Sequence, residues 1–184
     1  MNILFTAFGG TSAELLLREA GWQGLLLPSD KKKDAQLLIS EISSGKYDYI
    51  FSFGQKPGIK DKVYIETTAR NQGDALETGF DCGRLADALR ECFMQAKLSD
   101  HAGTSFCNHL YWSGLEYIRY NRMDVKMVFV HIPMRKNILE FGKFSRGVRS
   151  AVERVLVGDK SGHVRGGFSD SGLLEVPNTI NPGM

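Results

Sequence analysis

Short apolar runs alternate with amphipathic segments along most of this chain. The runs typical of buried strands cover residues 2–7, 24–27, 47–53, 63–65 and 126–131, and most end close to glycine or proline. The segments with a helical spacing of apolar side chains cover residues 11–21, 34–44, 83–96, 107–120 and 144–157. Strands that alternate with helices favour a parallel sheet, because each crossover helix packs on one face of it. The sequence therefore predicts an α/β fold, a three-layer α/β/α sandwich with a mostly parallel central sheet.

The length and composition predict one domain. A chain of 184 residues with 42% hydrophobic and 24% charged residues is large enough to bury a full-sized core. We therefore expect a single domain over residues 1–184. The tail over residues 158–184 is rich in glycine, serine and proline, and its pattern predicts no particular structure. Within this tail, residues 164–168 fit a small edge hairpin or a mobile arm equally well.

The charge and hydropathy of the chain argue against nucleic-acid and membrane partners. There are 23 basic and 21 acidic residues, so the net charge is only +2 and leaves no basic footprint. The three lysines at residues 31–33 are interpreted as a solvated start of a helix rather than as a phosphate site. No apolar run approaches the roughly 18 residues of a membrane span, and no signal-peptide pattern begins the sequence.

The cysteines give little indication of a metal or a disulfide framework. Cys82, Cys92 and Cys107 are odd in number and scattered, and no CxxC pair occurs. Cys82 and Cys92 flank a predicted helix and look like packing residues. Reduced thiols are typical of the cytosol, so we expect a soluble cytoplasmic protein.

Cys107 is the cysteine whose surroundings indicate chemistry. It follows the turn at Gly103 and begins the predicted helix over residues 107–120. A thiol at a helix N-terminus faces the positive end of the helix dipole and unpaired N–H groups, and both favour the thiolate. Cys107 is therefore a candidate nucleophile. The alternative is a small buried hydrophobic residue, the commoner role of a lone cysteine in an apolar segment.

The four histidines differ in how easily they could serve Cys107 as a base. His131 closes a buried strand-like run, and folding can bring such a histidine to a distant cysteine. His109 is two residues after Cys107, and residues with that spacing do not share a helix face. His101 precedes the glycine turn and would need an unusual loop path, while His163 lies in the unassigned tail. By elimination Cys107 and His131 form the best pair, unless His131 only makes a structural hydrogen bond.

Residues near the ends of other predicted strands extend this candidate site. Glu66 could orient a histidine as the third member of a triad, or it could be a surface glutamate. Glycine turns follow two strands at Gly9-Gly10 and Gly54-Gln55, and ligands of open α/β sheets bind beyond the carboxyl ends of strands. Such glycines let a backbone approach a substrate closely or simply form a turn. Neither turn has the GxGxxG or GxxxxGK pattern of a phosphate loop.

Five segments resemble the pyroglutamyl peptidase I family. Residues 102–108 (Ala-Gly-Thr-Ser-Phe-Cys-Asn) resemble its Ala-Gly-Thr-x-x-Cys-Asn signature. Residues 129–133 (Phe-Val-His-Ile-Pro) are similar to its histidine segment, and residues 66–71 (Glu-Thr-Thr-Ala-Arg-Asn) to its glutamate segment. Residues 8–10 and 54–55 resemble its N-terminal Phe-Gly-Gly loop and its Gly-Gln turn. The segments occur in the same order as in the family.

The resemblance implies a cysteine exopeptidase that removes an N-terminal pyroglutamyl (5-oxoprolyl) residue from peptides. It implies a triad in which Cys107 is the nucleophile, His131 the general base and Glu66 the residue that orients the histidine. It implies no metal and no cofactor. The partner is then a peptide or a small acyl-amide substrate, and a homo-oligomer would be unsurprising in such a family.

The resemblance also implies a pocket for a neutral lactam ring. Such a ring needs an apolar slot with a few hydrogen-bonding groups rather than a charged partner. Phe8 and Phe106 are expected to form its walls and to sandwich the ring, with polar contacts from Gln55. The expected substrate-binding residues are Phe8, Gly9, Gly10, Gln55 and Phe106.

Several segments around this pocket depart from the family pattern. Thr11-Ser12-Ala13 stands where the family has Asn-Pro-Ser after a longer loop, and residues 56–60 (Lys-Pro-Gly-Ile-Lys) replace Gly-Gly-Arg. Residues 75–78 stand where the family has Arg-Ile-Pro-Asp-Asn. The chemical centre is thus kept while the pocket is rebuilt. Three alternatives stay open: a cysteine hydrolase of another small acyl or amide substrate, an inactive binding homologue, and a redox-sensing thiol.

Overall fold

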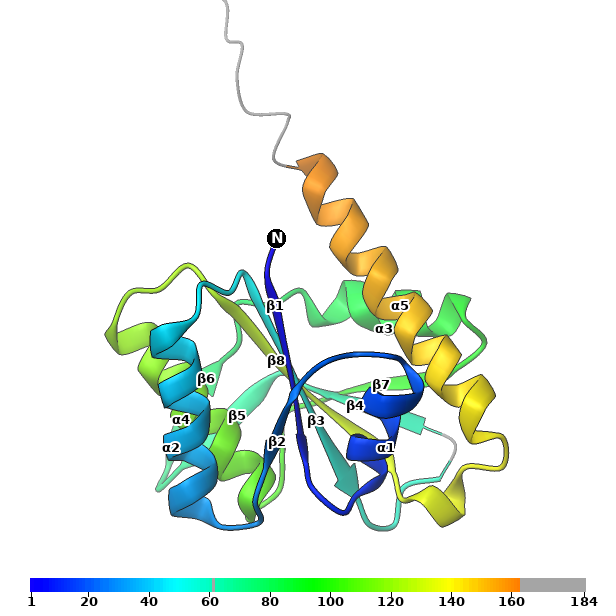
Figure 1. Cartoon of the computed structure of the whole chain (residues 1–184), viewed down its shortest axis with the longest axis horizontal. Coiled ribbons are helices and arrows are strands. Elements are labelled where there is room, and N and C mark those ends of the chain that lie inside the picture. Colours follow the sequence, from blue (N-terminus) through cyan, green and yellow to red (C-terminus); the bar gives the residue numbers. More distant parts are fainter. Residues whose placement is uncertain (61, 163–184) are drawn as a thin grey trace, which may run out of the picture.

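A six-stranded sheet forms the centre of the computed structural model, which describes residues 1–60 and 62–162 (Figure 1). The strand order is β2-β1-β3-β8-β4-β7. Its strands are β1 (Ile3–Phe8), β2 (Leu25–Leu27), β3 (Tyr49–Lys56), β4 (Lys62–Glu66), β7 (Gln95–Ser99) and β8 (Lys126–Pro133). Two further strands, β5 (Thr68–Asn71) and β6 (Asp74–Glu77), form a separate antiparallel hairpin.

The central sheet is mostly parallel, as predicted. Strands β1, β2, β3 and β8 run in one direction, whereas β4 is antiparallel to β8, and β7 is parallel to β4. The register of the β4–β8 pair places Tyr64 opposite His131 and Glu66 opposite Phe129. Because side chains alternate between the faces of a strand, Glu66 and His131 lie diagonally across from each other on one face.

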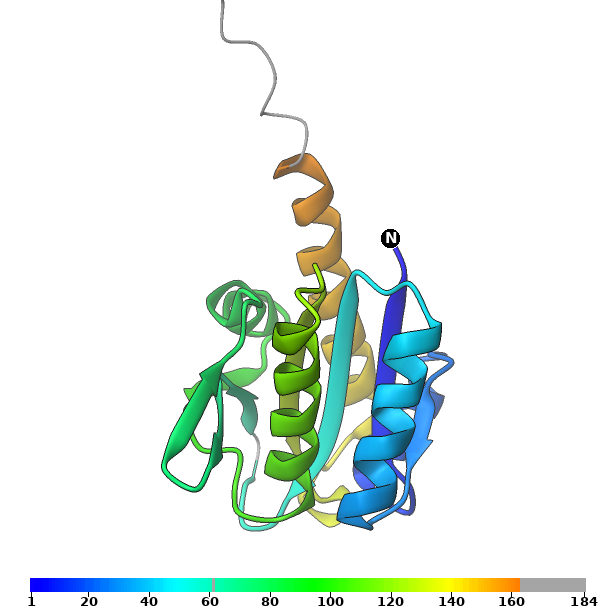
Figure 2. The ribbon, with the colours of Figure 1, turned by 90° about the vertical axis from the view of Figure 1, so that its left-hand side faces the viewer.

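Helices cover both faces of the sheet and complete the predicted three-layer sandwich (Figures 1 and 2). Helices α2 (Lys31–Ser44) and α4 (Phe106–Tyr120) pack side by side on one face. Helices α1 (Ser12–Glu19), α3 (Cys82–Glu91) and α5 (Phe141–Gly162) pack on the other. A single turn of tighter helix, η1 (Arg135–Asn137), lies between β8 and α5.

Two hydrophobic cores lie between these layers, one on each face of the sheet. In β3, Phe51 and Phe53 belong to the core with α1, α3 and α5, whereas Ile50 belongs to the core with α2 and α4. Covering both faces explains why this strand reads as a continuous apolar run. A buried polar pair interrupts the second face, where Thr6 Oγ1 donates to Ser52 Oγ at 2.8 Å.

Helix α2 begins earlier than the expected residue 34. The carboxylate of Asp30 caps it by accepting hydrogen bonds from the backbone N–H groups of Lys32 and Lys33, both at 3.1 Å. The lysines at 31–33 are exposed and form the start of the helix, as their interpretation predicted. Asp34 therefore lies inside the helix, where it is buried.

The expected polar loop over residues 70–78 contains most of the β5–β6 hairpin. Gln72 (φ 48°) and Gly73 (φ 97°) both have positive φ, as a two-residue hairpin turn requires. The pattern did not reveal these strands because each has only four residues, and five of their eight side chains are exposed. The hairpin packs beside α4.

The helix expected over residues 83–96 ends at Glu91. Phe93 has a left-handed backbone (φ 60°), and the N–H of Met94 donates to the carbonyl of Leu89 at 3.0 Å. This pair of features is the Schellman termination of a helix. The chain then forms β7, an edge strand whose largely exposed side chains left no apolar pattern to detect.

Helix α5 is longer than the expected 144–157, since it runs from Phe141 to Gly162. It therefore includes the first residues of the segment taken as an unassigned tail. The suggested hairpin or arm at residues 164–168, and His163, lie outside the described residues. Among the helices within the described ranges, none is both long and apolar enough to cross a membrane.

Candidate active site

Cys107 lies in the first turn of α4. The N-cap residue is Ser105, whose side chain makes no capping hydrogen bond within the described part of the chain. The first N–H groups of any helix have no intrahelical carbonyl partner. Because Ser105 does not cap them, these N–H groups of α4 remain available as donors. The helix thus presents N–H donors and the positive end of its dipole beside the thiol. Such donors suit a site where negative charge develops on an oxygen.

The Cys107 thiol packs against the end of β3. A Cβ atom at Gly54 would lie 2.9 Å from the Cys107 Sγ and 2.8 Å from the Phe129 Cζ, so the close approach depends on glycine. Gly54 is the register partner of His131 on β8, and neighbouring strands lie about 4.8 Å apart. Cys107 and His131 also line one pocket. The thiol and the imidazole are therefore neighbours at the ends of two adjacent parallel strands.

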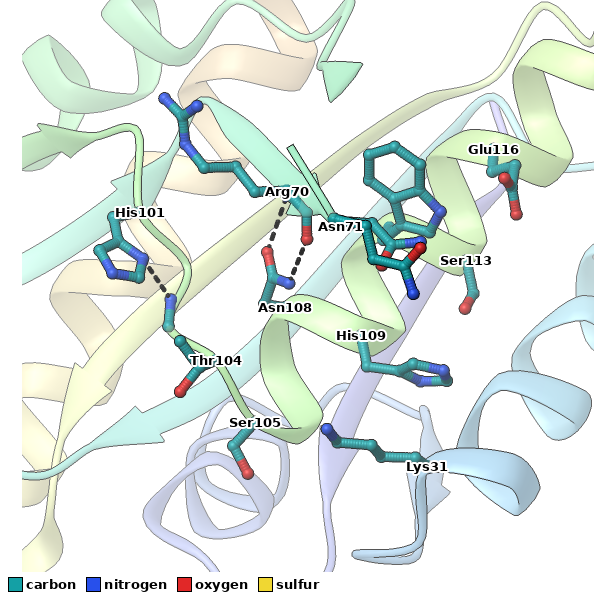
Figure 3. A pocket seen from close by; sticks show the side chains of 13 residues that line it. Lys31, Arg70, Asn71, His101, Thr104, Ser105, Asn108, His109, Ser113 and Glu116 are labelled. Atoms are coloured by element: carbon teal, nitrogen blue, oxygen red, sulfur yellow. Dashed lines mark hydrogen bonds between the residues drawn. The ribbon is translucent and has the colours of Figure 1, made fainter. Parts of the chain in front are cut away.

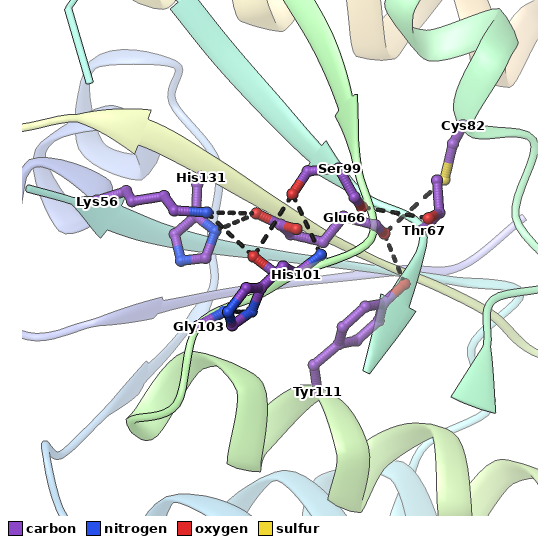
Figure 4. Close-up of polar contacts among 9 residues, drawn as sticks. All are labelled: Lys56, Glu66, Thr67, Cys82, Ser99, His101, Gly103, Tyr111 and His131. Atoms are coloured by element: carbon purple, nitrogen blue, oxygen red, sulfur yellow. Dashed lines mark hydrogen bonds and ion pairs between the residues drawn. The ribbon is translucent and has the colours of Figure 1, made fainter. Parts of the chain in front are cut away.

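Glu66 and His131 form a buried pair in this site (Figure 4). The Nδ1 atom of His131 lies 2.7 Å from the Oε1 atom of Glu66, and the two side chains are 3% and 0% exposed. With Nδ1 engaged by the carboxylate, Nε2 is the ring nitrogen that can exchange a proton with a thiol or substrate. The structure thus brings together Cys107, His131 and Glu66, the three residues of the implied triad.

Lys56 joins this pair, although the sequence analysis noted it only as a departure from the family pattern. Its Nζ atom lies 3.2 Å from the Oε1 of Glu66 and donates to the carbonyl of His101 at 3.1 Å. The same ammonium lies 5.1 Å from the centre of the Tyr64 ring. A buried carboxylate needs such compensation of its charge. The sequence could not reveal this contact, because Lys56 on β3 and Glu66 on β4 come together only when both strands pair with β8.

Two polar side chains of α4 tie this helix to the segment that follows β4. The Tyr111 hydroxyl donates to the backbone carbonyl of Glu66 at 2.9 Å. The Asn108 side chain accepts from the Arg70 N–H at 2.9 Å and donates to the Arg70 carbonyl at 2.7 Å. Asn108 directly follows the nucleophile candidate in the cysteine signature, but its role was not foreseen. Both contacts hold the helix that carries Cys107 against the strand that carries Glu66.

Burial favours the neutral forms of the Cys107 thiol and the His131 imidazole. It raises the pKa of the Cys107 thiol to about 12, and the hydrogen bond from the Cys107 backbone N–H offsets only part of this effect. Burial also lowers the pKa of His131, against the opposing hydrogen bond and charge of Glu66, while the Lys56 charge lowers it further. The expected preference for thiolate at the helix N-terminus is therefore outweighed by desolvation. Burial thus favours an uncharged imidazole beside a protonated thiol.

A pocket of about 320 Å³ opens over the thiol. Phe8, Gln55 and Phe106, three of the expected substrate-binding residues, line it together with Cys107 and His131. Further lining comes from residues that were not predicted, and these include Thr11, Ser29, Lys56 and Pro57. The pocket therefore combines apolar walls with a few polar groups, as sites for small neutral ligands do.

Gly9 and Gly10 do not line this pocket, contrary to the expectation. The Gly9 N–H donates to the carbonyl of Leu27 at 3.0 Å, and the Gly10 N–H donates to the Glu14 carboxylate at 2.7 Å. Gly10 also has a left-handed backbone, with φ of 72°. The two glycines thus shape the turn between β1 and α1, and their N–H groups are used within it.

The aromatic walls form a corner rather than a parallel slot. The rings of Phe8 and Phe106 are tilted by 54°, and their centroids are 6.4 Å apart. A flat ring stacked between two parallel aromatic rings needs roughly 7 Å, twice the optimal carbon–carbon separation. The expected sandwich is therefore not formed in this structure. The Gln55 side chain already has a partner within the protein, since its Oε1 atom accepts a hydrogen bond from the Ser12 N–H at 3.2 Å.

The other described histidines have different partners. The Nδ1 of His101 accepts from the Gly103 N–H at 3.1 Å, which stabilises the loop before α4. The Nδ1 of His109 faces Asp34 on α2, at 3.7 Å from its Oδ1. Cys82 is buried, which raises the pKa of its thiol to about 12, so its interpretation as a packing residue agrees with its position.

Substitution Gly54→Ala is expected to lower both activity and stability. The new methyl group would overlap Phe129 in the core and the Cys107 Sγ, and overpacking of this kind costs about 1–3 kcal/mol. Displacement of the Sγ should reduce kcat more than it raises KM. Thermal denaturation and steady-state kinetics measure the two effects. Gly79→Ala is the matched control, because a Cβ there meets no atom within 4 Å among the described residues.

The site thus combines a cysteine at a helix N-terminus with a histidine–glutamate pair on two strands of an α/β/α sandwich. Cysteine peptidases use an arrangement of this kind. The sequence model of the pyroglutamyl peptidase family matches residues 78–158. A pyrrolidone-carboxylate peptidase 1 of Caldanaerobacter subterraneus subsp. tengcongensis is 37% identical over an alignment 176 residues long. The match covers 76% of this chain and 86% of the relative. The chain belongs to the pyroglutamyl peptidase family.

Other relatives are more distant. A pyrrolidone-carboxylate peptidase of Brachyspira hyodysenteriae is 28% identical over an alignment 131 residues long. The match covers 59% of this chain and 65% of the relative, just under two thirds of the relative's length. A pyrrolidone carboxyl peptidase structure from Thermococcus litoralis has a TM-score of 0.75 at 15% identity. The superposition covers 96% of this chain and 99% of the Thermococcus litoralis chain. The Bacillus amyloliquefaciens pyroglutamyl peptidase I structure has a TM-score of 0.70 at 21% identity, with coverage of 82% and 94%. These structures share the fold.

Proposed function

We propose that this protein is a cysteine peptidase that cleaves an N-terminal pyroglutamyl residue from peptides. The observation that carries the proposal is the arrangement of three side chains. The Oε1 atom of Glu66 lies 2.7 Å from the Nδ1 atom of His131. The Cys107 Sγ atom packs against Gly54, the residue that pairs with His131 on the neighbouring strand. Homology to pyrrolidone-carboxylate peptidases supplies the substrate class. The apolar corner over the thiol supports a small acyl group without charge.

In the proposed reaction, the Nε2 of His131 takes the thiol proton of Cys107 as the Sγ attacks the scissile carbonyl carbon. The carbonyl oxygen becomes an oxyanion, which the Cys107 backbone N–H stabilises at the helix N-terminus. Collapse of this adduct breaks the C–N bond, and His131 returns the proton to the leaving amine. Water, deprotonated by His131, then cleaves the thioester and releases pyroglutamate and the free thiol. Glu66 orients the imidazole and stabilises its charged form throughout.

Kinetics on three aminocoumarin conjugates test this proposal. We expect turnover of the pyroglutamyl conjugate and much slower turnover of the prolyl and acetyl-alanyl conjugates. The rate should be lower than for relatives that keep the longer pocket loops, because the pocket walls are rebuilt here. Phe8→Ala should mainly raise KM, since it removes an apolar wall and leaves the triad intact. Preference for an open-chain acyl group would favour a hydrolase of another small acyl substrate.

Lys56→Gln is expected to move the acidic limb of the kcat/KM profile to higher pH. His131 must be neutral to accept the thiol proton, and the Lys56 charge helps to lower the pKa of His131. Removing that charge raises the pKa of His131, so activity is lost at a higher pH as the solution is acidified. Loss of a charge-assisted bond to Glu66 should also lower kcat by about 3- to 10-fold. Lys56→Arg, the matched control, should keep the wild-type profile; an unshifted limb in Lys56→Gln would contradict this role.

A further inference from the structure

A second cleft, of about 510 Å³, runs along the outer side of α4 (Figure 3). Its volume is within the range of small-molecule and peptide sites. Helix α4 lines it with Asn108, His109, Trp112, Ser113 and Glu116, and Lys31 of α2 and the β5–β6 hairpin complete it. The proposed chemistry uses none of these side chains directly.

This cleft adjoins the pocket over the thiol. The two cavities share the wall formed by residues 103–105, the loop that leads into α4 and Cys107. The β2–α2 connection and the start of α2 also reach both cavities, because Ser29 of the connection lines the thiol pocket and Lys31 of α2 lines the cleft. A pocket of about 320 Å³ suits one small acyl group, whereas a peptide substrate continues beyond the scissile bond. The adjoining cleft is where that continuation has room.

The end of the cleft next to this shared wall carries donors for an anion. Figure 3 shows the Lys31 ammonium pointing toward the start of α4, near Ser105 and His109. No carboxylate among the described residues forms an ion pair with Lys31, whereas the ammonium of Lys33 pairs with Asp30 at 3.8 Å. The ammonium of Lys31 is therefore free to bind a ligand, whereas that of Lys33 is paired with Asp30.

Three further side chains distinguish the ends of the cleft. The His109 side chain is 39% exposed, but its Nδ1 is buried and faces the carboxylate of Asp34 at 3.7 Å. The outer edge of the imidazole, with Nε2, is therefore the part that can meet a ligand. Arg70 is already paired with Asp100 at 2.9 Å, and Glu116 places negative charge farther along α4. Of the described lysine and arginine side chains that line the cleft, Lys31 is therefore the one left free to bind, and it lies near the start of α4 (Figure 3).

We infer that this cleft holds the peptide segment that follows the pyroglutamyl residue, and that Lys31 and His109 bind a carboxylate of that segment. The inference rests on the proposed function and extends it to the leaving part of the substrate. The carboxylate is either an acidic side chain or the C-terminus of a short peptide. An exposed ion pair is weak, so the effect is a modest preference and not an absolute requirement.

Four substrates separate the possibilities. Pyroglutamyl-aminocoumarin carries no peptide segment and reports the proposed function alone. Pyroglutamyl-Ala-Asn amide is the neutral peptide, pyroglutamyl-Ala-Asp amide adds a side-chain carboxylate, and pyroglutamyl-Ala-Asn with a free C-terminus adds a terminal one. Release of the new amino group at low salt gives kcat/KM for each peptide. We expect about a 3- to 10-fold higher kcat/KM for at least one carboxylate peptide than for the neutral peptide, and a smaller ratio at high salt.

Lys31→Gln should bring this ratio close to one while leaving turnover of the coumarin conjugate unchanged. Lys32→Gln is the matched control, because it removes the same charge from the same helix turn at a residue that does not line the cleft. A wild-type ratio near one, or equal effects of both substitutions, would overturn the inference and leave the proposed function standing. Absence of turnover of the coumarin conjugate and the peptides would overturn both.

Discussion

Cys107→Ala is expected to reduce hydrolysis of a pyroglutamyl substrate to background, a loss on the order of 10⁶-fold in kcat if it acts as the nucleophile of a hydrolytic triad. The substitution removes the sulfur atom that forms the thioester in the proposed reaction. It removes little volume from the packing around Gly54, so the melting temperature should change by only a few degrees. Steady-state kinetics and thermal denaturation of the same preparations measure both effects.

Cys92→Ser is the matched control for this prediction, because Cys92 is also a partly buried free thiol but lies at the end of α3, away from the reaction pocket. Its turnover should equal that of the wild type. Trapping provides a second test, since mass spectrometry of wild-type protein quenched during turnover should find the acyl group on Cys107. Undiminished hydrolysis by Cys107→Ala would rule out the nucleophile assignment and favour a binding or redox role for this thiol.

His131→Ala is expected to lower kcat by about 10³- to 10⁴-fold with little change in KM. The buried thiol has a raised pKa, so without a neighbouring base almost no thiolate forms at neutral pH. Residual activity of the variant should therefore increase steadily with pH, whereas wild-type activity should level off once His131 is neutral. A pH profile of kcat from about pH 5 to pH 10 distinguishes these forms. Similar profiles in the two proteins would remove His131 from the mechanism.

Glu66→Gln is the companion of this substitution and should retain partial activity. The amide can still hold the His131 ring by a hydrogen bond, but it does not stabilise the imidazolium. The variant also leaves Lys56 without its buried counter-charge, so some loss of thermal stability is expected. An activity equal to that of His131→Ala would show that charge, and not orientation, is what Glu66 contributes.

Much of the fold could be predicted because burial acts locally on the pattern of side chains. Strand β3 is covered on both faces, so its residues form one apolar run up to Phe53. The turn expected at Gly54-Gln55 is not formed there, because both residues lie inside β3, which continues to Lys56. Elements with little burial escaped detection for the same reason. The edge strand β7 and the β5–β6 hairpin are mostly exposed, and their backbone pairing leaves little trace in the residue types.

By itself, the sequence determined the layer architecture and the candidate residues Cys107 and His131, because a helix start and a strand end are local features. It did not determine how these residues meet. Glu66 is 65 positions from its hydrogen-bond partner, and it reaches His131 because β4 runs antiparallel to β8. That pairing, together with the pairing of β3 with β8, brings Lys56 to Glu66. The close contact of Cys107 with Gly54 depends on how α4 packs on the sheet. These contacts were decided by tertiary structure, since strand direction and helix docking follow from the packing of distant segments and not from any local period.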